Sequence, residues 1–307
     1  MFIIKYKKIF ISISVGFVIL SLAAMIVFGF RIGIDFKGGA LTEVLYQDTR
    51  PSMEILDPEL AKLNFGSILL QPTGEKGYII KSRDLNETEH VELLKTLSSD
   101  DKNKLEEKSF NSIGPSVGRE LTRKAIVSII LVSLMIICFI AFAFRKVSHP
   151  SAMGRHGVAS WQYGIIAIIT LLHDVAIPVG IFTFLSHYYG VEADTLFVVA
   201  VLTILGLSVS DTIVIFDRIR ENLKNQSNSK NINFGEIVGK SLDQSYVRSI
   251  STSLTVILVL LALVFFGPVS TKYFALMLTS GMFFGTYSSI FLASPLLVLV
   301  EEWQAKK

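Results

Sequence analysis

The chain has 307 residues, of which 51% are hydrophobic and only 18% are charged. A soluble domain usually carries about 25% charged residues, so this chain has too few charges to cover a water-facing surface. A net charge of +3 excludes a strongly basic nucleic-acid-binding domain, and a single cysteine, Cys138, excludes an intrachain disulfide scaffold. The remaining class is an integral membrane protein.

Six runs with at most one Asp, Glu, Lys or Arg are long enough to cross a bilayer, which takes about 20 predominantly apolar residues. In chain order they span residues 9–30, 125–144, 163–185, 195–216, 249–271 and 273–300. The last two are separated by a short turn around Gly267, Pro268 and Lys272. The first run is longer than the apolar region of about 7–15 residues in a cleaved signal peptide, which favours a retained anchor.

The Lys and Arg residues predict the orientation of the six spans. Fourteen of them flank one set of span ends, whereas the opposite short loops, 186–194 and 266–272, hold one, Lys272. Cytoplasmic loops carry an excess of Lys and Arg. We therefore expect a multi-pass membrane protein with both termini in the cytoplasm.

The segment between the first two spans has a different composition. Residues 31–122 contain 12 Lys or Arg and 16 Asp or Glu, and the orientation places them outside. Strands are expected at 41–46, 65–70, 78–81 and 108–113, and a helix at 87–97. We predict a bundle of six transmembrane helices with a small external α+β domain, divided as 1–30, 31–122 and 123–307.

Asp174 and Asp211 interrupt otherwise uncharged spans. An acidic residue inside a membrane is costly and usually faces the bundle interior, where it often marks a proton or ion path. Asp174 lies about 16 Å into its span and Asp211 about 8 Å from the inner end of the next. Arg248 enters the fifth span from that same side, so its depth allows a pair with Asp211. His173 adds a group that titrates near neutral pH.

Each of these residues also has a structural interpretation. Asp174 and His173 could be a hydrogen-bonding pair between helices, Asp211 a polar contact, and Arg248 a boundary anchor. Gly206, Ser210 and Thr212 predict close helix packing around Asp211. We find no metal-ligand cluster and no nucleotide-binding or hydrolase motif, so no cofactor is expected. Energy would come from an ion gradient or from a partner.

Five separated motifs occur in order along the chain. They are 33–39 (GIDFKGG, with Asp35, Gly38 and Gly39), 113–121 (with Gly114, Pro115 and Gly118), 171–174 (LLHD), 210–222 and 241–253. Together they resemble the SecF family of bacterial protein-export subunits, which is related to the RND transporters. The chain departs from the family pattern in a longer loop at 145–162 and in Ser210, where the family often has Asn.

The resemblance implies a function and a set of partners. SecF pairs with SecD as a twelve-helix unit that assists the SecYEG channel and the SecA motor, and the unit uses the proton-motive force to promote late-stage export of secreted preproteins. The external domain is ferredoxin-like in this family. The family's proton path falls on Asp211 and Arg248, together with an Asp of SecD, and its third-helix motif falls on His173 and Asp174.

Three other readings of the sequence stay open. A homodimer of six-helix halves could be a proton-coupled, RND-like exporter of small molecules. Asp174 and Asp211 could form the dyad of an intramembrane aspartyl protease, although the expected Gly-x-Gly-Asp pattern is absent around Asp211. The chain could also be a structural scaffold, in which Asp211 contributes only to the stability of a complex.

Overall fold

The computed structural model describes residues 2–99, 103–144, 158–225 and 233–306. Its contacts divide the chain into two compact units: Met1–Arg31 with Ser128–Lys307, called the helical unit below, and Ile32–Val127, called the α+β unit. The long loop expected at 145–162 lies outside the described residues up to position 157. The flanking cations Arg145, Lys146, Arg155, Lys230 and Lys307 lie outside them as well.

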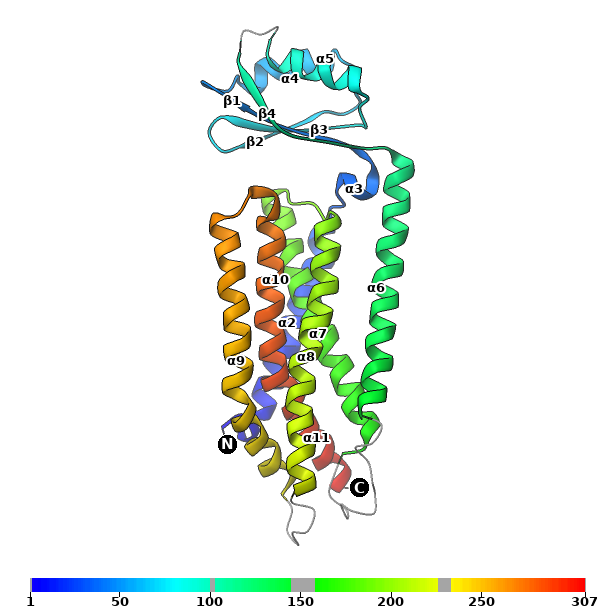
Figure 1. Ribbon diagram of the computed structural model, residues 1–307, viewed down its shortest axis with the longest axis vertical. Helices are drawn as coiled ribbons and strands as arrows, with labels where there is room; N and C mark the ends of the chain where they lie inside the picture. The colour runs from blue at the N-terminus through cyan, green and yellow to red at the C-terminus, as the bar shows by residue number, and fades with distance from the viewer. Residues whose placement is uncertain (1, 100–102, 145–157, 226–232, 307) are drawn as a thin grey trace. The chain divides into compact units, whose positions relative to one another are not determined.

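Six helices among the described residues are long and apolar enough to cross a membrane, as the charge-poor runs predict (Figure 1). They are α2 (Lys7–Phe28), α6 (Pro115–Phe144), α7 (Ser160–Tyr189), α8 (Thr195–Asn225), α9 (Phe234–Phe266) and a sixth span. The sixth span is made of α10 (Val269–Ser288), the π-helical turn η1 (Ser289–Ala293) and α11 (Ser294–Ala305). A short helix, α1 (Phe2–Lys5), precedes α2.

Two helix ends differ from the prediction. The fifth helix begins at Phe234, well before position 249, and the side chain of Asn233 caps it by accepting a hydrogen bond from the backbone of Glu236. An uncharged run marks where a helix becomes apolar and not where its hydrogen bonding starts. Lys272 lies inside α10, because the turn between the last two spans is confined to Gly267 and Pro268.

The sixth span changes its winding at η1, just before Pro295. Proline has no backbone N–H to donate to the preceding turn, and π turns of this kind accommodate such interruptions. The hydroxyl of Ser294 donates to the carbonyl of Ser289 at 3.1 Å across this turn. Ser288, Ser289 and Ser294 are all buried, so the turn is an internal polar feature of the bundle.

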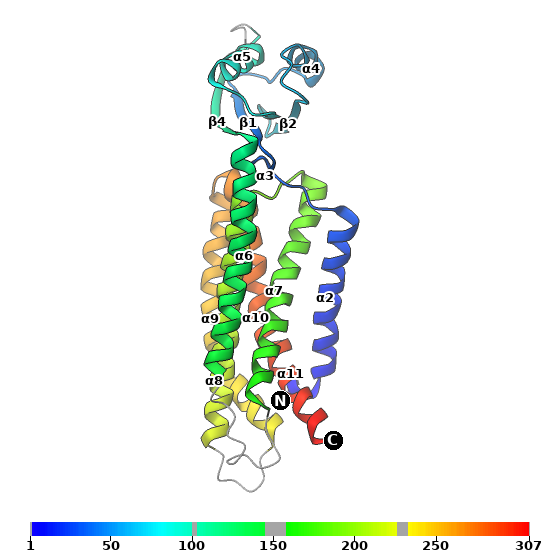
Figure 2. The ribbon, with the colours of Figure 1, turned by 90° about the vertical axis from the view of Figure 1, so that its right-hand side faces the viewer.

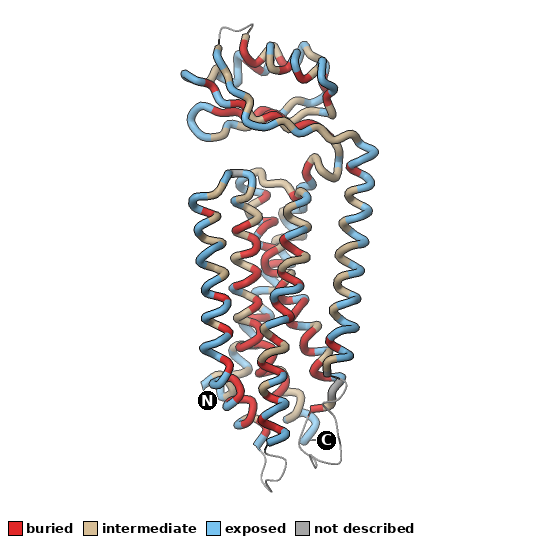
Figure 3. The backbone as a smooth tube through the Cα atoms, in the orientation of Figure 1, coloured by how far each residue is buried: buried red, intermediate tan, exposed pale blue. Residues whose placement is uncertain are grey.

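The centre of the helical unit is formed by α7, α8 and the sixth span. In their most apolar windows 56%, 50% and 56% of the residues are buried, compared with 11% in α2, 6% in α6 and 17% in α9. Figure 3 shows the buried positions concentrated on the central helices, and Figure 2 shows α6 and α2 on different sides of them. The apolar faces of α2, α6 and α9 therefore suit contact with lipid or with another membrane protein.

Glycine allows α8 and α10 to approach closely. A Cβ atom added at Gly281 would lie 2.4 Å from Ile204 Cγ1, and one added at Gly285 would lie 3.4 Å from Ser208 Cβ. The G-x-x-x-G spacing in the sixth span thus serves the close backbone approach that such motifs permit.

The α+β unit has the order β-α-β-β-α-β. Its elements are β1 (Gly39–Tyr46), α4 (Met53–Ala61), β2 (Leu69–Thr73), β3 (Gly77–Ser82), α5 (Glu87–Leu97) and β4 (Leu105–Ile113), preceded by α3 (Ile34–Lys37). The sheet order is β2-β3-β1-β4, with all neighbours antiparallel. This is the ferredoxin-like arrangement that the family resemblance implies. Buried side chains of the sheet and of both longer helices form its core.

Local signals explain most of these elements. The side chain of Asn86 accepts a hydrogen bond from the backbone of Glu89, whose carboxylate accepts from the backbone of Asn86, so a capping box starts α5 where it was predicted. Hydrogen bonds from Arg83 hold the pKa of the Glu89 carboxyl below its ordinary value, so the capping group stays ionised to a lower pH than a free glutamate would.

The strand predicted at 65–70 is misplaced, because β2 covers Leu69–Thr73. Phe65 is buried but belongs to the preceding loop, where Gly66 adopts a φ of 77°. The apolar residue therefore fills the core without pairing in the sheet. The hairpin itself is confirmed, since Thr73 pairs with Gly77 across a three-residue turn that contains Gly74 at a φ of 57°.

Two of the family motifs meet in the α+β unit. Gly38, at a φ of 82°, packs on the start of α6, and a Cβ there would lie 3.0 Å from Pro115 Cα. A Cβ at Gly118 would lie 2.9 Å from the Gly38 nitrogen and 3.0 Å from the Phe36 oxygen. The segments that enter and leave the unit thus pack backbone to backbone. Gly39 is equally confined, with Ser82 O 2.8 Å from the position of a Cβ.

We predict that Gly118→Ala destabilises this junction, whereas Gly114→Ala has little effect. The new methyl group at 118 would overlap two backbone atoms that cannot move independently, and overpacking of this kind costs about 1–3 kcal/mol. At Gly114 the nearest atom is Asp84 Oδ2, 4.0 Å away. Limited proteolysis of the full chain checks the prediction, with faster cleavage within residues 32–127 expected for Gly118→Ala. Equal cleavage rates for the two variants would contradict it.

We also predict that Gly281→Ala lowers the thermal unfolding midpoint of the purified chain. The added methyl would clash with Ile204 and separate α10 from α8, again at about 1–3 kcal/mol. Gly206→Ala is the matched control, because a Cβ there meets no heavy atom within 4 Å. Unfolding midpoints measured in the same detergent should differ between the two variants, and a midpoint unchanged by Gly281→Ala would disprove the close contact.

Candidate functional site

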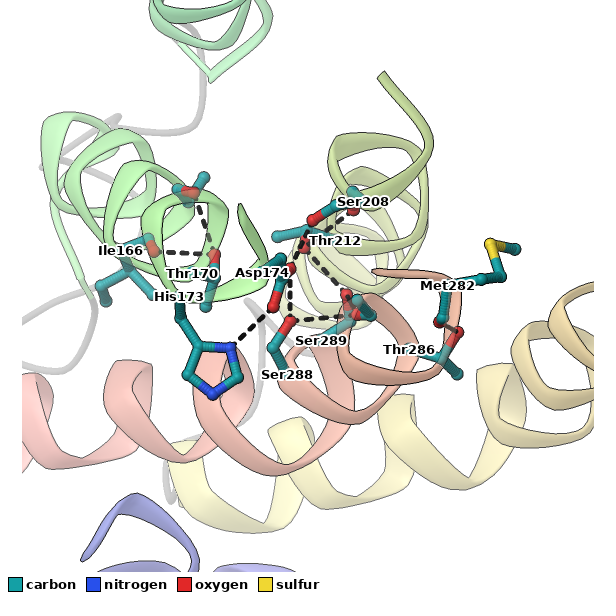
Figure 4. Close-up of polar contacts among 12 residues, drawn as sticks. Ile166, Thr170, His173, Asp174, Ser208, Thr212, Met282, Thr286, Ser288 and Ser289 are labelled. Carbon is teal, nitrogen blue, oxygen red and sulfur yellow. Dashed lines mark hydrogen bonds and ion pairs between the residues drawn. The ribbon is translucent and has the colours of Figure 1, made fainter. Parts of the chain in front are cut away.

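The carboxylate of Asp174 lies at the centre of a polar cluster in the helical unit (Figure 4). Its side chain, on α7, is fully buried. Oδ1 lies 2.7 Å from His173 Nδ1, and Oδ2 accepts hydrogen bonds from the hydroxyls of Ser208 on α8 and Ser288 on α10, the latter at 2.6 Å. One carboxylate therefore joins three helices.

A second pair of hydroxyl groups continues this cluster. Thr212 on α8 and Ser289 at the start of η1 are hydrogen-bonded at 2.9 Å. The hydroxyls of Ser288 and Ser289 also donate to the carbonyl of Gly285, each at 3.0 Å. Thr212, which the sequence placed near the site, thus belongs to the bonded network between α8 and the sixth span.

Asp211 forms a separate junction on α8. Its Oδ2 accepts hydrogen bonds from Thr286 on α10 at 3.1 Å and from Ser253 on α9 at 3.3 Å. The two hydroxyls are also hydrogen-bonded to each other. Asp211 is partly buried, unlike Asp174. This second carboxylate therefore connects α8, α9 and α10.

Arg248 does not pair with Asp211 in the part of the chain that the structure describes. Its side chain is exposed and lines a cavity of about 260 Å³ between α8 and α9, together with Asp217 and Gln244. Residues of an α-helix follow at about 100° intervals, so Arg248 lies about 140° around α9 from Ser253, which faces Asp211. The depth inferred from the sequence permits the pair, but the direction of the side chain does not.

Gly206 and Ser210 are not brought into helix packing within this chain. Both are exposed, and a Cβ at Gly206 would meet no heavy atom within 4 Å. They lie on the same helix as Asp211 but on a face that no other described helix covers. The small residues that do pack near the carboxylates are Ser208 and Gly285.

The arrangement suits charge accommodation and not peptide hydrolysis. A buried charge is tolerated when hydrogen bonds compensate its loss of hydration, and each carboxylate accepts at least two hydrogen bonds. Asp174 and Asp211 share no hydrogen bond with each other, so they do not form an aspartyl dyad. Among the described residues no three His, Cys, Asp or Glu side chains could hold a metal ion.

Sequence reasoning missed most of the hydroxyl partners. Ser253, Thr286, Ser288 and Ser289 stand in apolar spans where single hydroxyl residues are common. Their recurrence on the helix faces that meet the two aspartates is the available signal, and it becomes specific only when helix neighbours are known. Ser and Thr side chains within a helix can also hydrogen-bond the carbonyl four residues earlier on their own helix.

Comparison with protein-family models matches this chain to "Protein export membrane protein SecD/SecF, C-terminal" over residues 93–155 and 157–303. A protein translocase subunit SecF from Thermobaculum terrenum is 42% identical over 99% of this chain and 94% of its own length. The corresponding subunit from Anaerolinea thermophila is 32% identical over 98% of this chain and 95% of its own length.

Solved structures show the same relationship. A crystal structure of SecDF, a translocon-associated membrane protein from Thermus thermophilus, superposes with a TM-score of 0.79 at 28% identity. A second SecDF structure, in a super-membrane-facing form, gives a TM-score of 0.64 at 29% identity. Each match covers 97% of this chain but only 38% of the SecDF chain.

The family match extends over more than half of the chain, and relatives more than 30% identical align along nearly all of it. The fold and the six spans agree with this match. The chain belongs to the SecF family, a family of protein translocase subunits.

Proposed function

We propose that this chain acts with a SecD partner as an auxiliary unit of the Sec translocase, and that it uses the proton-motive force to promote late-stage export of secreted preproteins. Family membership supports the translocase role. The chain is similar to 38% of a SecDF chain, which favours SecD as the partner. The SecYEG channel, SecA and the preprotein are the further partners implied.

The observation that carries the proton coupling is the junction at Asp211. An ionised carboxylate accepts both hydroxyls, and hydrogen bonds to a charged acceptor are roughly twice as strong as neutral ones. A proton on Asp211 would remove this charge and weaken the ties from α8 to Ser253 on α9 and to Thr286 on α10. Protonation and deprotonation would then alternate two packing arrangements of these helices.

Arg248 and Asp174 take different parts in this proposal. Arg248 supplies a fixed positive charge in the cavity between α8 and α9. Arg218 and Glu221 line the same cavity, and they lie beyond Asp211 toward the C-terminal end of α8. Asp174 and His173 form the buried polar centre on which the moving helices rest. The proton route runs past Arg248 and reaches Asp211 before it reaches the fully buried Asp174.

The direction of transport follows from the proposed orientation. The described Lys and Arg residues at the start of α2, at the end of α8 and at the start of α9 lie at one end of the helical bundle (Figure 1). By the positive-inside rule this end is cytoplasmic, together with both termini, in a bacterial plasma membrane. Segment 31–122 then acts on the outer side, where the exported chain emerges.

We predict that Asp211→Asn abolishes the increase in preprotein export that a proton gradient produces. The amide keeps the size of the side chain and one acceptor oxygen but cannot cycle between charged and neutral forms. Export into membrane vesicles, with and without the gradient, measures the increase. Asp243→Asn, the same chemical change at an exposed position of α9, should leave the increase intact.

Two results separate this proposal from its competitors. A full gradient-dependent increase with Asp211→Asn would refute proton coupling at this residue. Normal export combined with a less stable purified complex would indicate the scaffold function.

We further predict that the chain co-purifies with a SecD-like membrane protein at a one-to-one ratio. The exposed apolar faces of α2, α6 and α9 leave room for a second helical bundle. Affinity purification from membranes of the native cell, followed by measurement of the mass of the complex, checks this. A homodimer of this chain without a second protein would instead support the small-molecule exporter.

A further inference from the structure

Among the buried polar atoms of the helical unit that make no hydrogen bond with a protein atom, three lie on helices that pack against one another. They are Ser14 Oγ on α2, His173 Nε2 on α7 and the hydroxyl of Tyr287 on α10. The side chain of Ser14 is fully buried and that of His173 is 3% exposed. Buried polar groups are nearly always hydrogen-bonded. We therefore ask whether one bound molecule could be the hydrogen-bond partner of all three atoms.

The packing of α2 on α7 places Ser14 beside His173. The two helices run parallel, because Ser21 contacts Gly180 and Phe28 lies 4.7 Å from His187 between ring centroids. These two contacts have the same offset in residue number, and the same offset relates Ser14 to His173. Each step along the pair is seven residues, about two helical turns, so all three contacts share one face of each helix.

The packing of α2 on the sixth span places Ser14 beside Tyr287. Here the helices are antiparallel, as shown by the ring contacts of Phe17 with Phe284 at 5.4 Å and of Phe10 with Phe291 at 4.8 Å. The register that relates these two pairs also pairs Ser14 with Tyr287. The ring centroids of Tyr287 and His173 are 6.4 Å apart and the rings are nearly parallel. Tyr287 and His173 are therefore neighbours as well.

The donor and acceptor roles of the three groups are complementary through one bridging molecule. An ionised Asp174 carboxylate can only accept, so His173 Nδ1 carries the hydrogen in their 2.7 Å contact, and Nε2 of the neutral imidazole is then an acceptor. In Figure 4 the second ring nitrogen of His173 points away from Asp174. The hydroxyls of Ser14 and Tyr287 can each donate or accept. A molecule with two donors and two acceptors would satisfy all three atoms.

We propose that Ser14, His173 and Tyr287 bind a water molecule at the junction of α2, α7 and α10. Buried waters typically make about three hydrogen bonds to polar groups that lack protein partners, which is the number offered here. The water donates to His173 Nε2 and bonds to the two hydroxyls. It continues the polar network of Asp174, through His173, as far as the first transmembrane helix.

This site also gives Asp174 a route for proton exchange, an extension that rests on the proposed function. A proton on the bound water would pass to His173 Nε2 while the Nδ1 proton passes to Asp174 Oδ1. The water and the imidazole end neutral, the imidazole as its other tautomer, and the carboxylate becomes a carboxyl group. The route reaches the buried carboxylate without passing Asp211.

A double-mutant cycle tests the water site without an export assay. Ser14→Ala and Tyr287→Phe should each lower the unfolding midpoint of the purified chain. The double variant should lie no lower than the worse single variant, because either change already removes the shared water. Ser12→Ala and Tyr188→Phe, at exposed positions of α2 and α7, are the matched controls and should change little. Strictly additive shifts would overturn the shared site.

A crystal structure at a resolution that places ordered waters gives the direct answer. Density within hydrogen-bond distance of all three groups, lost in Tyr287→Phe, is the expected result. No density there, in a map that shows buried waters elsewhere, would overturn the inference.

Export into vesicles then separates this inference from the proposed function. If the water serves as a relay, Ser14→Ala and Tyr287→Phe should reduce the gradient-dependent increase severalfold. A normal increase in both variants refutes the relay, and the water density decides the binding site independently. Failure of Asp211→Asn to affect export refutes the proposed function and leaves the expected density and midpoint shifts unchanged.

Discussion

The helical unit is organised around the solvation of the Asp174 carboxylate. A charge taken out of water is stable only when nearby groups replace its hydration, and here three different side chains do so. Two of them, Ser208 and Ser288, come from other helices. The requirement to solvate one group therefore fixes the positions of α8 and α10 against α7, and the other contacts of the bundle centre follow from this arrangement.

Short hydroxyl side chains can reach the carboxylate only if the helix backbones lie close together. Gly281 and Gly285 provide this approach, since their missing side chains accommodate Ile204 and Ser208 of α8. Apolar attraction between helices is weak inside a bilayer, where lipid is as apolar as the side chains. Close packing and hydrogen bonding are then the main forces that hold the bundle. In α10 the glycines allow the close approach that the short hydroxyl side chains need in order to reach the carboxylate.

The sequence predicts the large-scale design because that design depends on composition. Six charge-poor runs identify the spans, and the helical spacing of Val91, Leu94 and Leu97 identifies α5. The elements that it misplaces depend on tertiary contacts: Phe65 is apolar and buried but lies outside the sheet. The same limit applies to the site. The depth of Arg248 follows from counting residues, whereas its direction depends on which face of α9 meets α8.

The two carboxylates are suited to different tasks, although the same helix contacts both. On α10, Thr286 donates to Asp211 and Ser288 donates to Asp174. Two positions along an α-helix correspond to a rotation of about 200°, so α10 is held from opposite sides. Asp174 is fully enclosed and bonded by three side chains, whereas Asp211 is partly exposed and bonded by two.

A change of charge at Asp211 would release one side of α10 while Asp174 retains the other, so the helix would pivot and not detach. The π turn directly after Ser288 lies between α10 and α11, where such a pivot would be absorbed. Small shifts become discrete rearrangements when packed elements have two alternative arrangements. In the proposed function, a carboxylate held by three side chains next to one held by two would provide these conditions: Asp174 would define the axis of the pivot, and a change of charge at Asp211 would select the state.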